Sequence, residues 1–242
     1  MDEIAVLIPC YNEEYTISEV VTGFRKYLPD AAVYVYDNGS SDRTAELAEK
    51  AGAIVRYEPC RGKGNVVRRM FREVDAGCYI MIDGDATYDP KYAAWMTDII
   101  LKGDADMVVG NRMSGAFKAV NTRPFHTVGN MLVTNTVNIL FGGDFKDVMT
   151  GYRAMSYAFV KSFHAMSKGF EIETEMSIYA AERHMRVENI DIAYKERSPE
   201  SPSKLSTFRD GIKILWMIIR MFSLQRHYWK NPRKLATQPL GR

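Results

Sequence analysis

The sequence predicts an α/β fold with a mostly parallel central sheet flanked by helices. Short β-rich runs alternate with amphipathic helical stretches through the first half of the 242-residue chain, the pattern of parallel strands joined by crossover helices. With 46% hydrophobic residues, the chain can bury one substantial core and fits one large domain better than two small ones. The formal net charge of +2 gives no reason to expect nucleic acid as a partner.

The alternation of hydrophobic residues assigns the elements in order. Strands are expected at residues 4–9, 32–36, 54–57, 78–82 and 107–110, and helices at residues 14–27, 42–51, 64–74 and 90–101. Beyond Gly110 the rhythm changes. Helices are expected at residues 128–141 and 173–184, a strand at 187–194 and a polar loop at 197–206.

The most informative motif is Asp83-Gly84-Asp85, which follows an apolar run. A buried strand that ends in this way projects carboxylates at the edge of the sheet, where open α/β folds bind ligands. Two carboxylates beside a small residue suit Mg²⁺ or Mn²⁺, which can in turn hold a diphosphate. A solvated turn is the alternative interpretation, because Asp and Gly are common turn residues.

Polar residues also follow the first two predicted strands. Pro9, Tyr11 and Glu13 lie at the end of the first strand, where an aromatic ring and an acid can hold a base and a ribose. Asp37 leaves the second strand, a favourable place for binding a ribose hydroxyl or a base N–H. Ordinary strand-to-helix turns are the alternative, since acids are also favoured in the first turn of a helix.

Arg61-Gly62-Lys63-Gly64-Asn65 opens the third predicted helix. Glycines let the backbone approach a phosphate, and Lys63 adds a positive charge at a helix N-terminus. The motif lacks the third glycine of a dinucleotide fingerprint and the ending of a P-loop.

The order of these four motifs at successive strand ends resembles that of the family 2 glycosyltransferases. The resemblance implies a GT-A-type nucleotide-sugar-binding fold and an inverting hexosyltransferase. It implies that Pro9, Tyr11, Glu13, Asp37, Lys63 and Asp83 surround the nucleotide, and that Asp83 and Asp85 hold the metal and its diphosphate. Many relatives have a second Asp where this chain has Asn38.

The second half resembles the dolichyl-phosphate mannose synthases and their bacterial polyprenyl-phosphate relatives. The stretch Asp147–Arg153 is similar to their D-x-x-[ST]-G-[FY]-R motif, and the loop from Arg197 to Leu205 is similar to their basic loop ending in S-K-L. Asp147 and Arg153 join Asp85 as candidate catalytic residues. The candidates for binding an acceptor phosphate are Arg112, Arg123, Thr127, Arg197 and Lys204. Arginine suits that role because it recognises phosphate with paired hydrogen bonds.

A polyprenyl or dolichyl phosphate is therefore the expected acceptor and a nucleotide sugar the expected donor. A phosphate monoester is largely ionised at neutral pH and needs little help from a base. A saccharide hydroxyl, the alternative acceptor, would need a general base such as Asp147, Glu171 or Glu173. The form Asp83–Tyr88 of the metal motif resembles that of glucose- and N-acetylglucosamine-transferring relatives more than that of mannose synthases. This resemblance implies UDP-glucose or UDP-GlcNAc as the donor, with GDP-mannose as the alternative. A non-catalytic nucleotide-sugar-binding protein is a more remote hypothesis.

The C-terminal segment suits a membrane surface. We expect a catalytic domain at residues 1–206, an amphipathic, interfacial helix at 207–230 and a flexible tail at 231–242. Trp216, long apolar side chains and a basic flank favour lying in the bilayer interface or against a membrane partner protein. A core helix or a dimer contact is the alternative. Neither a secretory signal nor a span of roughly 18 apolar residues is apparent. The three cysteines, at positions 10, 60 and 78, suggest reduced thiols. We thus expect a cytoplasmic protein attached peripherally to the membrane.

Overall fold

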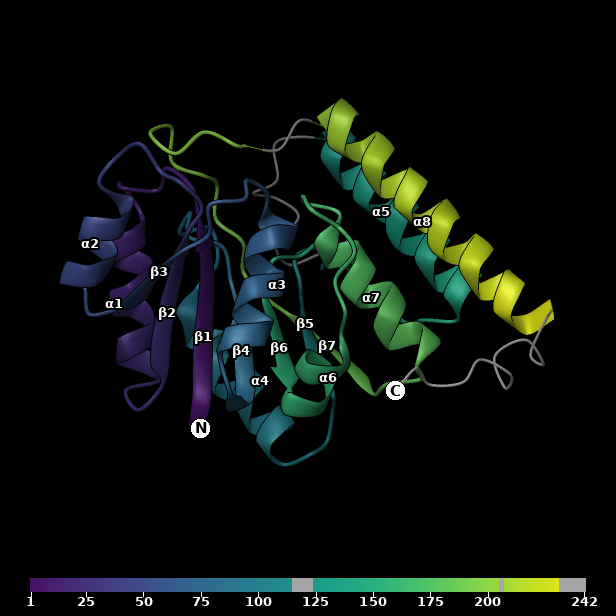
Figure 1. The fold of residues 1–242 in the computed structure, drawn as a ribbon, viewed down its shortest axis with the longest axis horizontal. Coiled ribbons are helices and arrows are strands. Elements are labelled where there is room, and N and C mark those ends of the chain that lie inside the picture. The colour runs from purple at the N-terminus through teal and green to yellow at the C-terminus, as the bar shows by residue number, and fades with distance from the viewer. Residues whose placement is uncertain (115–123, 205–206, 231–242) are drawn as a thin grey trace, which may run out of the picture.

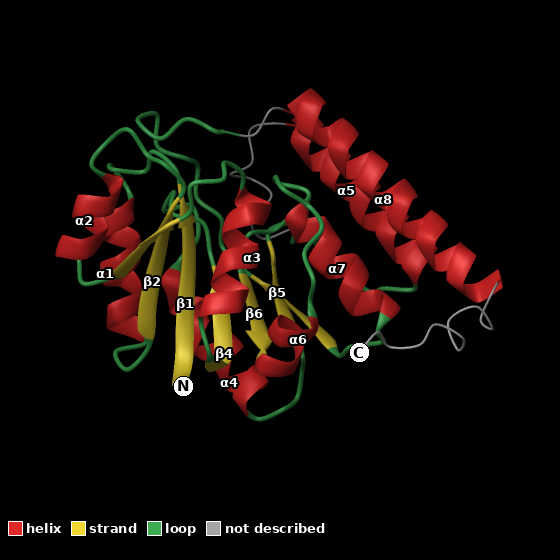
Figure 2. Ribbon diagram, in the orientation of Figure 1, coloured by secondary structure: helices red, strands yellow, loops and turns green. Residues whose placement is uncertain are grey.

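A seven-stranded mixed sheet forms the centre of the computed structural model, which describes residues 1–114, 124–204 and 207–230 (Figures 1 and 2). The strand order is β3-β2-β1-β4-β6-β5-β7. All neighbouring pairs are parallel except those of β6, which runs antiparallel to both β4 and β5. The strands are β1 Asp2–Cys10, β2 Ala32–Asp37, β3 Ile54–Tyr57, β4 Ala76–Met81, β5 Met107–Asn111, β6 Arg153–Ser156 and β7 Val187–Asp191.

Helices cover both faces of the sheet. One face carries α1, α2 and α4, and the other carries α3, α5, α6, α7 and α8 (Figure 1). The helices are α1 Ile17–Tyr27, α2 Thr44–Lys50, α3 Lys63–Glu73, α4 Ala93–Leu101, α5 Pro124–Phe141, α6 Tyr157–Ser162, α7 Ile172–Glu182 and α8 Thr207–Lys230, with a 3₁₀ turn, η1, at Pro90–Tyr92.

The central strand β1 shows why the sheet is buried on both faces. Ala5 and Leu7 join the hydrophobic cluster on the α3 side, whereas Val6 and Ile8 join the cluster on the α1 side. All four side chains are fully buried, as expected for a parallel strand covered by helices on both faces. At the edge of the sheet, β3 exposes Ile54 and Tyr57.

The predicted α/β class and mostly parallel sheet are confirmed, but the sequence analysis missed β6 and α6. Both are short, and β6 is inserted between two strands that precede it in the chain. Ser156 ends β6 and caps α6, because its hydroxyl accepts a hydrogen bond from the Phe159 backbone N–H at 3.2 Å. Among the described residues, no helix has both the length and the apolarity needed to cross a bilayer.

Phe159 anchors α6 in the core, and its replacement tests the importance of this missed element. The ring is fully buried and stacks on Phe163 with centroids 5.6 Å apart. We expect Phe159→Ala to lower the free energy of unfolding by about 3–5 kcal/mol in urea denaturation, because it leaves a large cavity. The neighbouring Tyr157 is 45% exposed, so Tyr157→Ala should cost much less; equal losses would contradict the assigned packing.

Candidate functional site

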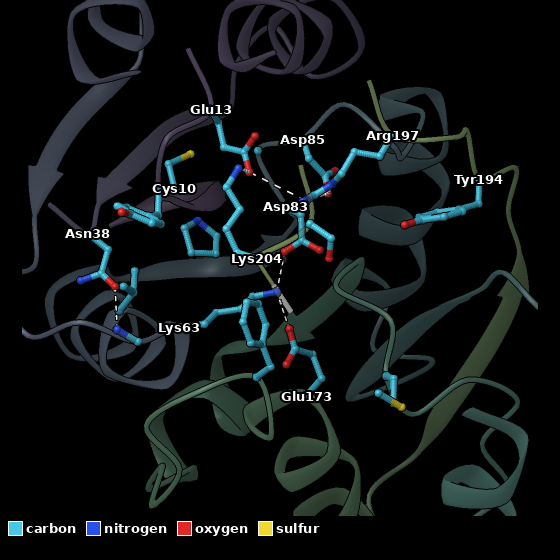
Figure 3. A pocket seen from close by; sticks show the side chains of 18 of the residues that line it. Cys10, Glu13, Asn38, Lys63, Asp83, Asp85, Glu173, Tyr194, Arg197 and Lys204 are labelled. Carbon is cyan, nitrogen blue, oxygen red and sulfur yellow. Dashed lines mark hydrogen bonds and ion pairs between the residues drawn. The ribbon is translucent and has the colours of Figure 1, made fainter. Parts of the chain in front are cut away.

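A pocket of about 630 Å³ lies where the central parallel strands end. Such a volume is typical of ligand sites, and the carboxyl edge of an open α/β sheet is their usual position. The sequence-predicted residues that line it are Pro9, Tyr11, Glu13, Lys63, Asp83, Asp85, Arg112, Arg197 and Lys204. Figure 3 shows several of these side chains converging from different elements. The structure therefore brings most of the predicted nucleotide, metal and phosphate residues into one cavity.

The glycine between the two aspartates is required by packing. A Cβ atom at Gly84 would lie 2.6 Å from the Cys10 sulfur at the end of β1. Gly151 has a matching role, since a Cβ there would collide with the carboxylate of Asp83. Gly84 thus lets the acidic motif pack against the end of β1, and Gly151 lets Asp83 pack against the Asp147–Arg153 stretch.

Asp85 is almost fully buried and its contacts fix its orientation. The Thr87 hydroxyl donates a hydrogen bond of 2.6 Å to Oδ1, and Arg197 Nε lies 3.0 Å from Oδ2. Burial raises the pKa of Asp85, but the Arg197 guanidinium and Thr87 outweigh burial and hold the pKa below its usual value. Asp85 is consequently an anion at neutral pH.

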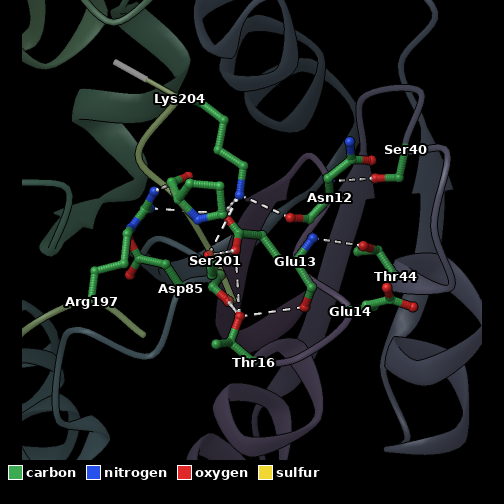
Figure 4. A network of polar contacts seen from close by, with 12 residues as sticks. Asn12, Glu13, Glu14, Thr16, Ser40, Thr44, Asp85, Arg197, Ser201 and Lys204 are labelled. Atoms are coloured by element: carbon green, nitrogen blue, oxygen red, sulfur yellow. Dashed lines mark hydrogen bonds and ion pairs between the residues drawn. The ribbon is translucent and has the colours of Figure 1, made fainter. Parts of the chain in front are cut away.

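The basic loop after β7 closes over the acidic end of β1 (Figure 4). Lys204 Nζ lies 2.6 Å from Glu13 Oε1 and 2.8 Å from the Asn12 carbonyl oxygen. The Ser201 hydroxyl donates a hydrogen bond to Glu13, and Arg197 Nη2 lies 3.8 Å from the same carboxylate. Glu13 therefore anchors the loop, while its predicted contact with a nucleotide stays a prediction.

The Arg61-to-Asn65 motif forms the start of α3 and one wall of the pocket. Gly62 has φ +123°, a conformation that L side chains rarely adopt, and a Cβ there would collide with the Lys168 carbonyl oxygen.

Lys63 then projects between two carboxylates, Asp83 and Glu173, and pairs with both (Figure 3). Burial lowers the pKa of Lys63, but these two anions outweigh burial and raise it, so the ammonium keeps its charge.

Another wall of the pocket is formed by Tyr11, Arg61 and Asn38. The Arg61 guanidinium stacks over the Tyr11 ring with its carbon 3.5 Å from the ring centroid. Asn38 Oδ1 accepts a hydrogen bond of 2.7 Å from the Gly62 backbone N–H and thereby holds the glycine-rich loop in place. Asp37 does not belong to the pocket lining; its carboxylate accepts a hydrogen bond from the Ser40 backbone N–H.

Asp147, a predicted catalytic residue, makes its contacts beside the pocket with Arg112, and its catalytic role stays a prediction. Its side chain is fully buried and lies outside the pocket lining. Arg112 Nε and Nη2 bind it at 2.7 and 3.0 Å, and Asn130 Nδ2 binds it at 2.8 Å. Burial raises the pKa of Asp147, but Arg112 and Asn130 outweigh burial and lower it. Asp147 therefore positions Arg112, which does line the pocket.

Arg153 is likewise buried and outside the pocket lining, and its catalytic role stays a prediction. The guanidinium is 0% exposed and donates to the Val148 carbonyl at 2.7 Å, the Thr150 carbonyl at 3.2 Å and the Ser177 hydroxyl at 3.0 Å. Burial lowers its pKa to about 10, so the group is still charged at neutral pH. Arg153 holds the turn that carries Gly151 against Asp83. Arg123 lies outside the described residues, and Thr127 belongs to α5 at a position whose side chain is also outside them.

The sequence analysis left several lining residues without an assigned role in the leading hypothesis, among them Arg61, Glu173 and Tyr194. Tyr194 lies under the Arg112 guanidinium, 5.2 Å from its ring centroid to the guanidinium carbon. Burial raises the pKa of Glu173 above its usual value, although Lys63 lowers it. The acidic run Glu171–Glu175 gave a signal, but its spacing did not show which carboxylate faces the pocket.

The donor set of the pocket fits a divalent cation. Asp83 and Asp85 supply hard carboxylate oxygens, and Gly151 leaves room for the carboxylate of Asp83. Among the described residues no group of three or more His, Cys, Asp or Glu side chains forms a complete cage. Two carboxylates that share a cation with substrate phosphates are the usual arrangement for Mg²⁺.

Comparison with known proteins identifies the family. Residues 5–162 match the family described as Glycosyl transferase family 2. The chain is a member of this family. It is 36% identical to glycosyltransferase AglJ of Haloferax volcanii, over 87% of this chain and 69% of the relative. It is 29% identical to a dolichyl-phosphate hexose transferase of the same organism, over 91% and 94% of the two chains.

The solved structures confirm the GT-A fold of this family 2 glycosyltransferase. Glucosyl-3-phosphoglycerate synthase from Mycobacterium tuberculosis, crystallised with Mn²⁺ and UDP-glucose, matches with a TM-score of 0.72 and 22% identity. The match covers 90% of this chain and 79% of the synthase. At this identity the likeness establishes the fold alone.

The buried position of Arg153 leads to a prediction about stability. We expect Arg153→Met to lower the free energy of unfolding by about 2–4 kcal/mol, because it leaves buried carbonyl groups without donors. Urea denaturation measures this change. Arg72→Met is the matched control, since Arg72 lies on the surface with its side chain 72% exposed, and it should cost about 0.5 kcal/mol or less. A fully stable Arg153→Met protein that binds substrate poorly would instead indicate that Arg153 contacts the substrate directly.

Proposed function

We propose that this protein transfers a hexose, with inversion, from a nucleotide-diphosphate sugar to a polyprenyl or dolichyl phosphate. The observation that carries the proposal is a single pocket that combines the Asp83/Asp85 pair with the cations Arg112, Arg197 and Lys204. The acidic pair suits a metal-bound diphosphate, and the cations suit a second phosphate. A site for a neutral acceptor would not need these cations beside the acidic pair. The similarity to a dolichyl-phosphate hexose transferase over most of both chains supports the same acceptor class.

The donor is proposed to bind along the β1, β2 and α3 side of the pocket. Tyr11, with Arg61 stacked on it, offers an aromatic surface for the base, and Pro9 and Glu13 line the same end. Asp83 and Asp85 would hold Mg²⁺ or Mn²⁺, which supplies Lewis-acid neutralisation of the diphosphate leaving group when bound. UDP-glucose or UDP-GlcNAc is the favoured donor, with GDP-mannose as the alternative.

The acceptor phosphate is proposed to bind near Arg112 and the basic loop. The Asp147 carboxylate accepts hydrogen bonds from two nitrogens of Arg112 and so holds the guanidinium at the pocket wall. Arg197 and Lys204 come from the loop, and Arg123 and Thr127 stay proposals for the same phosphate. An ionised phosphate oxygen can attack the anomeric carbon without a general base, which fits the burial of Asp147, the first candidate for that base.

Product formation tests the proposal. The protein is incubated with Mg²⁺ or Mn²⁺, a short polyprenyl phosphate, and in turn UDP-glucose, UDP-GlcNAc and GDP-mannose; a glycolipid is expected with one of them. Asp85→Asn should lower kcat/KM by about 100-fold or more, because the metal-bound diphosphate loses a charged ligand. Asp98→Asn is the matched control on an exposed helix surface. Transfer to free saccharides without transfer to the lipid would favour the hydroxyl-acceptor alternative.

We also propose that α5 and α8 rest on the membrane surface that holds the acceptor. The two helices lie side by side, with Phe141 and Phe222 in contact, and Figure 1 shows them on one flank of the sheet. Both start shortly after pocket residues, α5 downstream of Arg112 and α8 downstream of Lys204. Among the described side chains of these helices, the exposed apolar ones are Val128, Met131, Leu132, Ile139, Ile212, Leu215, Trp216, Ile219 and Leu224. Exposed apolar surface on this scale is typical of membrane or partner contacts.

Vesicle binding tests the membrane proposal. Ile219 is 63% exposed on α8, so Ile219→Glu should leave folding intact while reducing sedimentation with anionic phospholipid vesicles by about tenfold, because a charge opposes interfacial burial. Leu101→Glu makes the same change at an exposed apolar position on α4 and should bind vesicles as the wild type does. Equal vesicle binding by all three proteins would contradict the role of α8.

A further inference from the structure

One buried carboxylate oxygen in the pocket finds no hydrogen-bond donor in the part of the chain that the structure describes. Glu173 lies in the first turn of α7 and is 4% exposed, yet it belongs to the pocket lining (Figure 3). Its Oε1 pairs with Lys63. Its Oε2 is buried without a hydrogen-bond partner among the described residues. Because leaving a buried charged acceptor unpaired is costly, such an atom calls for an explanation.

The surroundings fix Glu173 in this position. The neighbouring acid on the same helix, Glu175, accepts hydrogen bonds from the Met166 and Ser167 backbone N–H groups at 2.7 and 2.8 Å, which secures the turn before α7. That turn packs directly on the start of α3, since a Cβ at Gly64 would collide with the Ser167 carbonyl. Backbone contacts between the start of α3 and the turn before α7 thus hold Lys63 and Glu173 in place.

Lys63 also places Glu173 relative to the proposed metal site. The same ammonium group pairs with Asp83, so a single positive group separates Glu173 from one of the two proposed metal ligands. A sugar attached to a diphosphate held at Asp83 and Asp85 would lie within the part of the pocket that these groups enclose. A carboxylate accepts hydrogen bonds and donates none when ionised, so its natural partner there is a sugar hydroxyl.

We propose that Glu173 is a specificity-determining residue whose free Oε2 accepts a hydrogen bond from a hydroxyl of the donor hexose. The inference rests on the proposed function, since it takes a nucleotide sugar as the donor. Lys63 serves as the positioning residue that holds the carboxylate. A site that satisfies a buried acceptor through a substrate hydroxyl discriminates against an analogue that lacks it, because the acceptor is then left unpaired.

Binding without acceptor tests this inference. Calorimetry with Mg²⁺ compares UDP-glucose, UDP-GlcNAc and GDP-mannose with UDP and GDP. For the sugar that binds tightest, Glu173→Gln should weaken binding by about 10–100-fold, the loss of one charged hydrogen bond. The affinity for the matching free nucleotide should stay within about twofold. Glu182→Gln, at the other end of α7, is the matched control and should change neither affinity.

Deoxy analogues of that donor make the test specific. Wild-type protein should bind one monodeoxy sugar nucleotide about 10–100-fold more weakly than the parent sugar nucleotide. Glu173→Gln should bind the deoxy and parent compounds nearly equally, because the variant already lacks the contact that the missing hydroxyl would make. Unchanged discrimination in the variant would overturn the inference. So would unchanged sugar-nucleotide binding with a reduced kcat and an altered pH profile, which would mark Glu173 as a base acting on the acceptor.

The outcome separates this inference from the proposed acceptor. If no glycolipid forms but Glu173→Gln still loses sugar discrimination, the acceptor proposal fails and the inference stands. If glycolipid forms and Glu173→Gln binds every donor as the wild type does, only the inference fails. A thermal melt of the variant shows whether it is folded; if it is not, Glu173→Asp, which keeps the charge but withdraws it by one methylene, is measured in the same binding series.

Discussion

Four of the acidic side chains that line the pocket are each held by a cation from another part of the chain. Glu13, Asp83, Asp85 and Glu173 would repel one another if they were left unpaired at this depth. Lys63 arrives from α3, while Arg197 and Lys204 arrive from the loop after β7. The acids can gather at the carboxyl edge of the sheet only because these segments close over them. The charge balance of the pocket therefore dictates the position of both the glycine-rich loop and the basic loop.

Close backbone packing at glycine residues fixes the positions of the segments that carry these charged side chains. Gly62 and Gly64 let α3 approach the turn before α7, and Gly84 and Gly151 let the acidic motif lie between β1 and the Asp147–Arg153 stretch. Behind that stretch, Arg153 satisfies carbonyl groups that would otherwise be buried without partners. A charged residue in the interior thus supports the site without entering it, since its hydrogen bonds fix a turn that touches Asp83.

The wall that carries Glu173 is continuous with the flank proposed to meet the membrane. Ile172 and Met176 of α7 belong to the same hydrophobic cluster as Ile214, Met217 and Ile218 of α8. One side of α8 is therefore committed to the core, and its other side exposes Trp216 and Ile219. Packing of this kind couples the position of the surface helix to the wall of the pocket, because close-packed interiors transmit displacement rather than absorb it.

Much of the fold was determined by local sequence. The alternation of apolar runs and amphipathic stretches predicted the parallel core, and the ends of β1 and β4 predicted where Glu13 and Asp83 would meet, because parallel strands end at a common edge. At the end of β2 the sequence pointed to Asp37, whereas Asn38 lines the pocket. The sequence did not reveal β6, which is short and whose antiparallel partners lie far away in the chain. Nor did it distinguish Arg112, which faces the pocket, from Arg153, which is buried behind it. Only the tertiary structure decided these points, since residue type gives the charge of a side chain whereas burial and partners determine what that charge can contact.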